Sequence, residues 1–154
     1  MTTRRRRLVA ALVVALLLAG CGGDDTDASG DGGGPVVSDV WARPTPPLTG
    51  AAAFFLEIAN EGAEVERITA VSSPGCAETL VHTTAIDDGV ATMARAEDAG
   101  LTIEPGERLL MEPLGLHVMC LGPEEPLVDG ETFELTIEFD PAGAVTATGA
   151  IENR

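Results

Sequence analysis

The chain has 154 residues, with 25 acidic side chains against nine basic ones and a formal net charge of −16. This length accommodates one domain and hardly two. The acidity excludes nucleic acid and an anionic membrane surface as binding partners, because both would repel the protein. Aromatic residues make up only 3% of the chain, so aliphatic side chains must build most of the core.

The N-terminal segment has the layout of an export signal. Four arginines at residues 4–7 precede an apolar run at residues 8–19, which is shorter than a membrane-spanning helix of about 20 residues. The run leads into Leu18-Ala19-Gly20-Cys21, which resembles the lipobox of bacterial lipoproteins. That resemblance implies a signal peptide at residues 1–20 and a diacylglycerol on Cys21. An ordinary secretory signal with a chance cysteine is the alternative.

The segment that follows has the composition of a spacer. Residues 22–34 read GGDDTDASGDGGG and cannot bury apolar surface, so we expect a disordered tether. We therefore expect a signal peptide at residues 1–20, a lipidated cysteine with its linker at residues 21–34, and one folded domain at residues 35–154. Removal of the signal peptide discards four arginines and no acid, which makes the mature chain more acidic still.

Short patterns of period two in the folded domain predict strands with one buried face. The clearest is at residues 131–139, where apolar residues alternate with Glu134, Thr136 and Glu138. Eight further strands are predicted at residues 36–42, 52–59, 65–71, 79–84, 90–94, 108–112, 116–121 and 144–150. Turn signals separate nearly all of them, and no stretch shows a sustained helical period with caps. About nine short strands predict an all-β fold, a two-sheet antiparallel β-sandwich in preference to a barrel.

Two cysteines remain once Cys21 is assigned to lipid. An exported protein lives where thiols oxidise, so we predict a disulfide between Cys76 and Cys120. Two buried free thiols, or a metal thiolate at Cys120, are the alternatives. The predicted strand at residues 116–121 places Cys120 with the apolar, core-facing side chains, which argues against the thiolate.

The opposite face of that strand carries His117 and Met119, the most informative pair in the chain. Their spacing places an imidazole and a thioether within about 7 Å along one strand face. The other histidine of the chain, His82, lies on a predicted strand that a hairpin would join to the strand of Met93. Two imidazoles and two thioethers together suit copper, above all Cu(I), and suit zinc, calcium or magnesium poorly.

Methionine suits a metal site in the oxidising compartment outside the cytoplasm. A thioether forms no disulfide and carries no proton, so only the histidines would make metal affinity fall with pH. The alternative is that the methionines fill the core and the histidines have no role. Met111 lies in an apolar run and is assigned to the core.

These residues resemble the signature of the PCuAC copper chaperones, in which a His is followed after ten residues by a Met and later by His-x-Met. Ten residues separate His82 from Met93 here, and 23 separate Met93 from His117-Val118-Met119. Trp41-Ala42-Arg43, Asn60-Glu61-Gly62 and Pro113-Leu114-Gly115 also resemble the family, across nearly the whole folded unit. Thr83 departs from the pattern, since many members carry a second Met there.

The resemblance implies a cupredoxin-like antiparallel sandwich, with Greek-key connections, that lacks a blue-copper centre. It implies a surface Cu(I) site formed by His82, Met93, His117 and Met119. It further implies delivery of copper to the Cu-A centre of cytochrome c oxidase, often alongside a Sco-type thiol protein. A flexible tether and a lipid anchor on the outer face of the cell membrane would suit that task. The lipid anchor would be the protein's only contact with the membrane.

Other classes of function fit the sequence less well. A cupredoxin electron carrier needs a Cys thiolate with nearby histidines, and no histidine follows Cys120. No Ser/His/Asp or paired-carboxylate pattern stands above the acidic background, so we do not expect an enzyme. A sandwich lipoprotein with a structural or protein-binding role, or a general extracytoplasmic copper buffer, are the alternatives that remain.

Overall fold

The computed structural model describes residues 33–96 and 101–154, which form strands joined mostly by short turns. The strands are β1 (Pro35–Ala42), β2 (Ala51–Asn60), β3 (Glu66–Ser72), β4 (Cys76–Asp87), β5 (Val90–Arg95), β6 (Thr102–Ile103), β7 (Arg108–Met111), β8 (Leu116–Pro123), β9 (Thr132–Asp140) and β10 (Gly143–Ile151). The predicted signal peptide and Cys21 lie outside the described residues, as does nearly all of the linker. No helix in the described part of the chain is long and apolar enough to cross a membrane.

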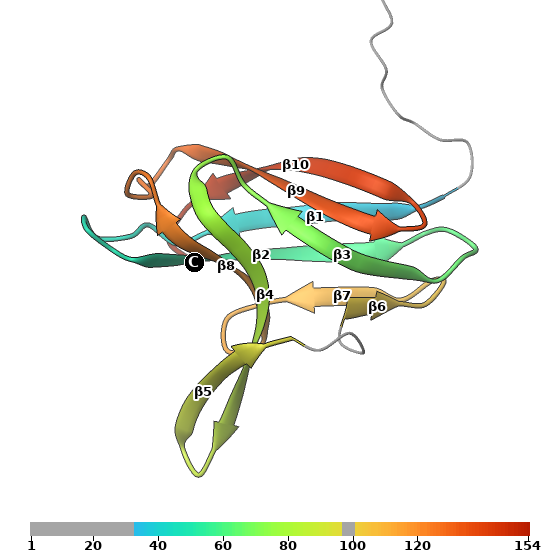
Figure 1. Cartoon of the computed structure of the whole chain (residues 1–154), viewed down its shortest axis with the longest axis horizontal. Coiled ribbons are helices and arrows are strands. Elements are labelled where there is room, and N and C mark those ends of the chain that lie inside the picture. The colour runs from blue at the N-terminus through green and yellow to red at the C-terminus, as the bar shows by residue number, and fades with distance from the viewer. Residues whose placement is uncertain (1–32, 97–100) are drawn as a thin grey trace, which may run out of the picture.

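The strands form one continuous hydrogen-bonded path that folds over on itself (Figure 1). Its order is β5-β4-β8-β2-β1-β10-β9-β3-β6, and β7 also pairs with β2. Buried side chains from both halves of the path pack into a single apolar cluster, so the all-β sandwich predicted from the sequence is confirmed. Nine strands match predicted ones, and the tenth, β6, has only two residues.

The sheet differs from the fully antiparallel prediction at β1. Trp41 and Ala42 pair in parallel with Ala150 and Ile151 of β10, while the same strand runs antiparallel to β2. The pairing of β1 with β2 shifts register between Ser38 and Trp41, where Asp39 adopts a φ of 49°. Such a bulge redirects a strand, and here it brings the end of β1 alongside β10.

Alternation along two strands fixes which side chains enter the core. Leu135, Ile137 and Phe139 of β9 are buried, as their period-two pattern predicts. On β8, Val118 and Cys120 are 0% and 1% exposed and belong to the same apolar cluster. The sequence correctly placed Cys120 in the core, opposite to the face that carries His117 and Met119.

A disulfide joins β4 to β8. The sulfur atoms of Cys76 and Cys120 are bonded, with Cα atoms 5.4 Å apart, which confirms the predicted pairing. The two strands are also paired antiparallel from Cys76↔Pro123 to Thr83↔Leu116. This half of β4 is therefore held covalently and by a ladder of hydrogen bonds.

The other half of β4 continues away from the body into a hairpin with β5 (Figure 1). The turn between them has Asp88 at φ 48° and Gly89 at φ 80°. Two central residues with positive φ define a type I′ turn, for which Asp-Gly is a favoured sequence. All six residues of β5 are exposed.

Candidate metal centre

The register of β4 with β8 sets the two histidines opposite one another. His82 and His117 are direct cross-strand partners, so their side chains leave the sheet on the same face. The ring centroids are 6.2 Å apart and the rings are nearly perpendicular, at 87°. The structure therefore brings together two residues that are 35 positions apart in the chain.

The methionines lie to either side of this histidine pair. Met119 is directly opposite Leu80, which places it on the face of His82 and two residues along β8 from His117. Met93 is directly opposite Thr84 of β4, on the same face but shifted toward the hairpin tip. Arg95, not Met93, occupies the position opposite His82. The hairpin thus places Met93 diagonally to His82, where its side chain is 63% exposed.

His117 is more enclosed than the surface site expected from the resemblance. It is only 4% exposed, because its ring packs against Phe55 with centroids 6.3 Å apart. Phe55 in turn lies 4.6 Å from the ring of Trp41. The four predicted ligand positions therefore range from buried at His117 to open at Met93.

A backbone carbonyl orients the His117 ring. Its Nδ1 lies 3.0 Å from the oxygen of Gly115, which also accepts the backbone N–H of Thr84. An Nδ1–H that donates to a carbonyl leaves Nε2 with its lone pair available, the usual arrangement for a metal-binding histidine. The short turn before β8 thereby fixes both the ring and the neighbouring strand.

His82 carries a buried nitrogen that has no partner. Its Nδ1 is the sole buried side-chain nitrogen or oxygen without a hydrogen bond in the described part of the chain. Partial burial, followed by the nearby His117 and Arg95, lowers the pKa of His82 below its ordinary value. A neutral imidazole with an unpaired, buried nitrogen is chemically suited to coordinate a metal ion.

The described residues offer the histidine pair no third ligand of the common metal-binding types. Within residues 33–96 and 101–154, no three His, Cys, Asp or Glu side chains gather as a possible metal cluster. The thiolate alternative for Cys120 is wrong, because that sulfur is in the disulfide. Met111 is buried in the core, as predicted, and is separate from the histidines.

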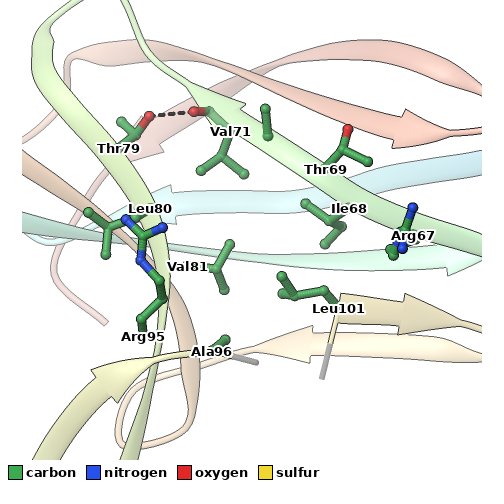
Figure 2. A pocket seen from close by; sticks show the side chains of 11 residues that line it. Arg67, Ile68, Thr69, Val71, Thr79, Leu80, Val81, Arg95, Ala96 and Leu101 are labelled. Carbon is green, nitrogen blue, oxygen red and sulfur yellow. Dashed lines mark hydrogen bonds between the residues drawn. The ribbon is translucent and has the colours of Figure 1, made fainter. Parts of the chain in front are cut away.

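A cavity of about 460 Å³ adjoins the site between β3 and β4. Figure 2 shows Ile68 and Val71 of β3 on one side and Thr79, Leu80 and Val81 of β4 on the other. Leu80 and Arg95, which line it, are the cross-strand partners of Met119 and His82. Sequence reasoning did not identify this cavity or the packing of Phe55 against His117, because both depend on contacts between distant strands.

Solved structures share the fold of this domain. The PCuAC domain of PmoF1 in its apo form superimposes with a TM-score of 0.64 at 23% identity and covers 80% of this chain and 98% of its own. The copper-bound PCuAC domain of PmoF2 gives 0.62 at 24% identity over 80% and 96%. Apo-DR1885 from Deinococcus radiodurans gives 0.61 at 19% identity over 96% and 97%. The fold is that of a PCuAC domain, as the sequence motif predicts.

Comparison of sequences places the chain in a family. Residues 36–151 match the model of the family described as "Putative lipoprotein LpqE-like". The chain belongs to this LpqE-like lipoprotein family. It is 28% identical over 103 residues to "Putative lipoprotein Lxx21020" of Leifsonia xyli subsp. xyli (strain CTCB07), an alignment that covers 67% of this chain and about 60% of that relative.

Proposed function

We propose that this domain binds Cu(I) through His82, His117, Met119 and Met93 and carries it outside the cytoplasmic membrane. The observation that carries the proposal is the cross-strand pair of histidines beside Met119, with a buried nitrogen of His82 left unpaired. A metal bound by a ring nitrogen at about 2 Å lies about 3.2 Å from the ring centroid, so two rings sharing one ion have centroids at most about 6.4 Å apart, a separation reached when the two nitrogens bind nearly opposite each other. The observed 6.2 Å satisfies that limit.

The ligand types favour Cu(I) over harder ions. Thioether sulfur is a soft ligand, and among residues 33–96 and 101–154 no carboxylate completes the set. Two of the structures that share the fold are the copper-bound PCuAC domain from PmoF2 and CuI-DR1885. Both support copper as the cargo, and the second supports the reduced ion.

We place the carrier at the outer face of the cell membrane, held by lipid on Cys21 and the linker at residues 21–34. Membership of a lipoprotein family supports this location. We further propose delivery to the Cu-A centre of cytochrome c oxidase, with a Sco-type protein as a possible companion. The partly open site supports a transfer role, because a recipient's ligands can reach Met93 without unfolding the sheet.

Competitive titration with Cu(I) tests the binding site. Residues 22–154, purified without lipid, should bind one Cu(I) per chain against a chelator of known affinity. Binding should weaken strongly in His117→Ala and in Met119→Leu, which keeps the side-chain volume and removes the sulfur. Leu110→Ala, at an exposed position of β7, is the matched control and should bind like wild type. Equal affinity in all four proteins would contradict the site.

Delivery needs a separate measurement. The copper-loaded protein should pass Cu(I) to the soluble Cu-A domain of cytochrome c oxidase faster than spontaneous dissociation allows. Tight binding with transfer no faster than dissociation would instead support the copper buffer. An absence of copper binding would leave the structural or protein-binding lipoprotein as the remaining function.

A further inference from the structure

The hairpin that carries Met93 is unprotected along its outer edge. We call residues 84–94 the arm. Its strand β5 lies at one end of the sheet path, where β4 is its one partner among the described strands, and each of its residues is exposed. Natural edge strands are shielded by charged side chains, proline or a bulge. In β5 the one charged residue is Arg95, at the end away from the tip, and residues 90–94 contain no charge, proline or bulge. Such an edge is suited to contact with another protein.

Large apolar side chains gather on the arm and beside it. Ile86, Val90 and Met93 are 60%, 62% and 63% exposed. The ladder places Ile86 and Met93 on the same face as His82, and it places Val90, which is opposite Asp87, on the other face near the tip. Apolar side chains are therefore exposed on both faces of the arm. Leu114, 67% exposed, lies in the turn next to Gly115, whose carbonyl oxygen accepts the N–H of Thr84. Exposed apolar residues that cluster around a site indicate an interaction surface.

The charges near this surface are mostly acidic. Asp87 and Asp88 form the exposed tip of the arm, and Glu112 is exposed in the turn that contains Leu114. Arg95 is a cation at the base of the arm, and its guanidinium lies 3.9 Å from the carboxylate of Glu78. A partner that fits this surface has apolar side chains at the centre of its docking face and basic ones at the rim.

We propose that the arm and Leu114 form the docking surface for the protein that receives the copper, a partner with an apolar centre and a basic rim. The proposal rests on the copper-carrier function proposed above. A partner seated on the arm reaches Met93 before the other ligands. Its own ligand then replaces the Met93 thioether on Cu(I), while the histidines and Met119 still hold the ion. The exchange moves no electron, and the neutral thioether leaves without taking a proton.

The rate of copper transfer tests the docking surface. In the mature lipidated chain held in detergent, Ile86→Ser/Val90→Ser should slow transfer to the soluble Cu-A domain by about tenfold or more. Its affinity for Cu(I) and its transfer to a small-molecule chelator should remain as in wild type, because neither needs docking. Leu110→Ser/Val128→Ser is the matched control, with exposures of 53% and 51% away from the arm.

A charge variant tests the same surface without touching its apolar residues. Asp87→Asn/Asp88→Asn should slow transfer at low salt by several-fold and have little effect at high salt. Asn tolerates the positive φ of Asp88, so the turn is preserved. Glu124→Gln/Glu125→Gln removes two exposed carboxylates elsewhere and should leave the rate unchanged.

Each outcome decides between the docking surface and the copper site. Unchanged transfer by both arm variants would overturn the docking surface while leaving the carrier function intact. Loss of Cu(I) affinity in Ile86→Ser/Val90→Ser would also overturn it, because the arm would then act on the metal site. If the arm variants transfer copper normally but no longer self-associate as wild type does, the surface binds a second copy of this chain, and the proposed docking role is overturned. If the wild-type protein passes copper to the Cu-A domain and to a Sco-type protein no faster than to the chelator, both the docking surface and the delivery role are overturned. The copper site itself is judged separately, by the Cu(I) titration.

Discussion

The two halves of β4 occupy different environments, although they belong to one strand. The first half, through Thr83, pairs with β8 and is tied to it by the Cys76–Cys120 disulfide. Val81 lies there in the core, and the hydroxyl of Thr79 donates to the carbonyl of Val71. The second half, from Ala85 onward, pairs with β5 alone and is exposed. The first is an anchored region and the second is the arm.

The predicted ligands are divided unequally between these regions. His82, His117 and Met119 stand on the anchored pair β4 and β8, whereas Met93 stands on the arm. The anchored ligands are held before any metal arrives, so binding sacrifices little conformational freedom there. Met93 is exposed and must be ordered on binding. We therefore expect the anchored region to set how tightly the ion is held and the arm to set how readily it leaves.

The largest effect should come from breaking the anchor. Cys76→Ala/Cys120→Ala opens a loop whose ends are 44 residues apart, and the chain-entropy model gives a loss of about 4 kcal/mol of stability. Urea denaturation should show a clearly lower midpoint than for wild type. Wild type treated with reductant should match the double variant, and reductant should not affect the variant. Equal midpoints would mean that the hydrogen-bond ladder alone anchors β4.

Removing an anchored thioether should cause the next largest effect. Met119→Leu conserves volume but removes the sulfur, and we expect Cu(I) affinity to fall about 100-fold, or about 2.7 kcal/mol. Competitive titration measures it. Met111→Leu is the matched control, because Met111 is a buried core residue with no predicted ligand role. If both variants bind as wild type does, Met119 is not a ligand.

The matching substitution on the arm should matter less for affinity. We expect Met93→Leu to weaken Cu(I) binding by about tenfold at most, or about 1.4 kcal/mol, because an exposed ligand gains less after the cost of ordering it. The same titration compares it with Met119→Leu. An equal or larger loss in Met93→Leu would show that the arm folds onto the site, and the division into two regions would fail.

Much of the fold was predictable because alternation records which face of a strand is buried. The strands at β8 and β9, and the inward position of Cys120, follow from that period alone. Two features do not. β6 is too short to show a period, and the parallel pairing of β1 with β10 depends on a bulge at Asp39 that no local pattern marks.

The candidate site was predictable in its residues but only partly in its arrangement. A two-residue Asp88-Gly89 turn fixes the hairpin register, and it could have placed Met93 opposite Thr84 from the sequence. The register of β4 with β8 had no such local signal, since the segment between them includes β5, β6 and β7. The burial of His117 under Phe55 likewise arises from the packing of β2 beside β8.

The smallest expected effect tests whether His82 belongs to the anchored region. In the metal-free protein, burial, His117 and Arg95 lower its pKa, whereas in the unfolded chain it is about 6.5. The unfolded chain therefore takes up a proton that the folded protein resists. The stability contributed by neutral His82 is complete above about pH 6.5 and declines as the pH falls toward the lower folded value.

Comparison with His82→Gln isolates this contribution from the many carboxylates that also titrate. Between pH 7 and 5, wild type should lose slightly more stability than His82→Gln in urea denaturation, while Met93→Leu should follow wild type. Arg95 is close to Glu78, so its effect on His82 should grow if Glu78→Gln removes that carboxylate. If the stability of wild type and of His82→Gln falls equally between pH 7 and 5, His82 is as freely hydrated as the arm. The boundary between the two regions would then lie before His82, and only β8 would hold its ligands in place.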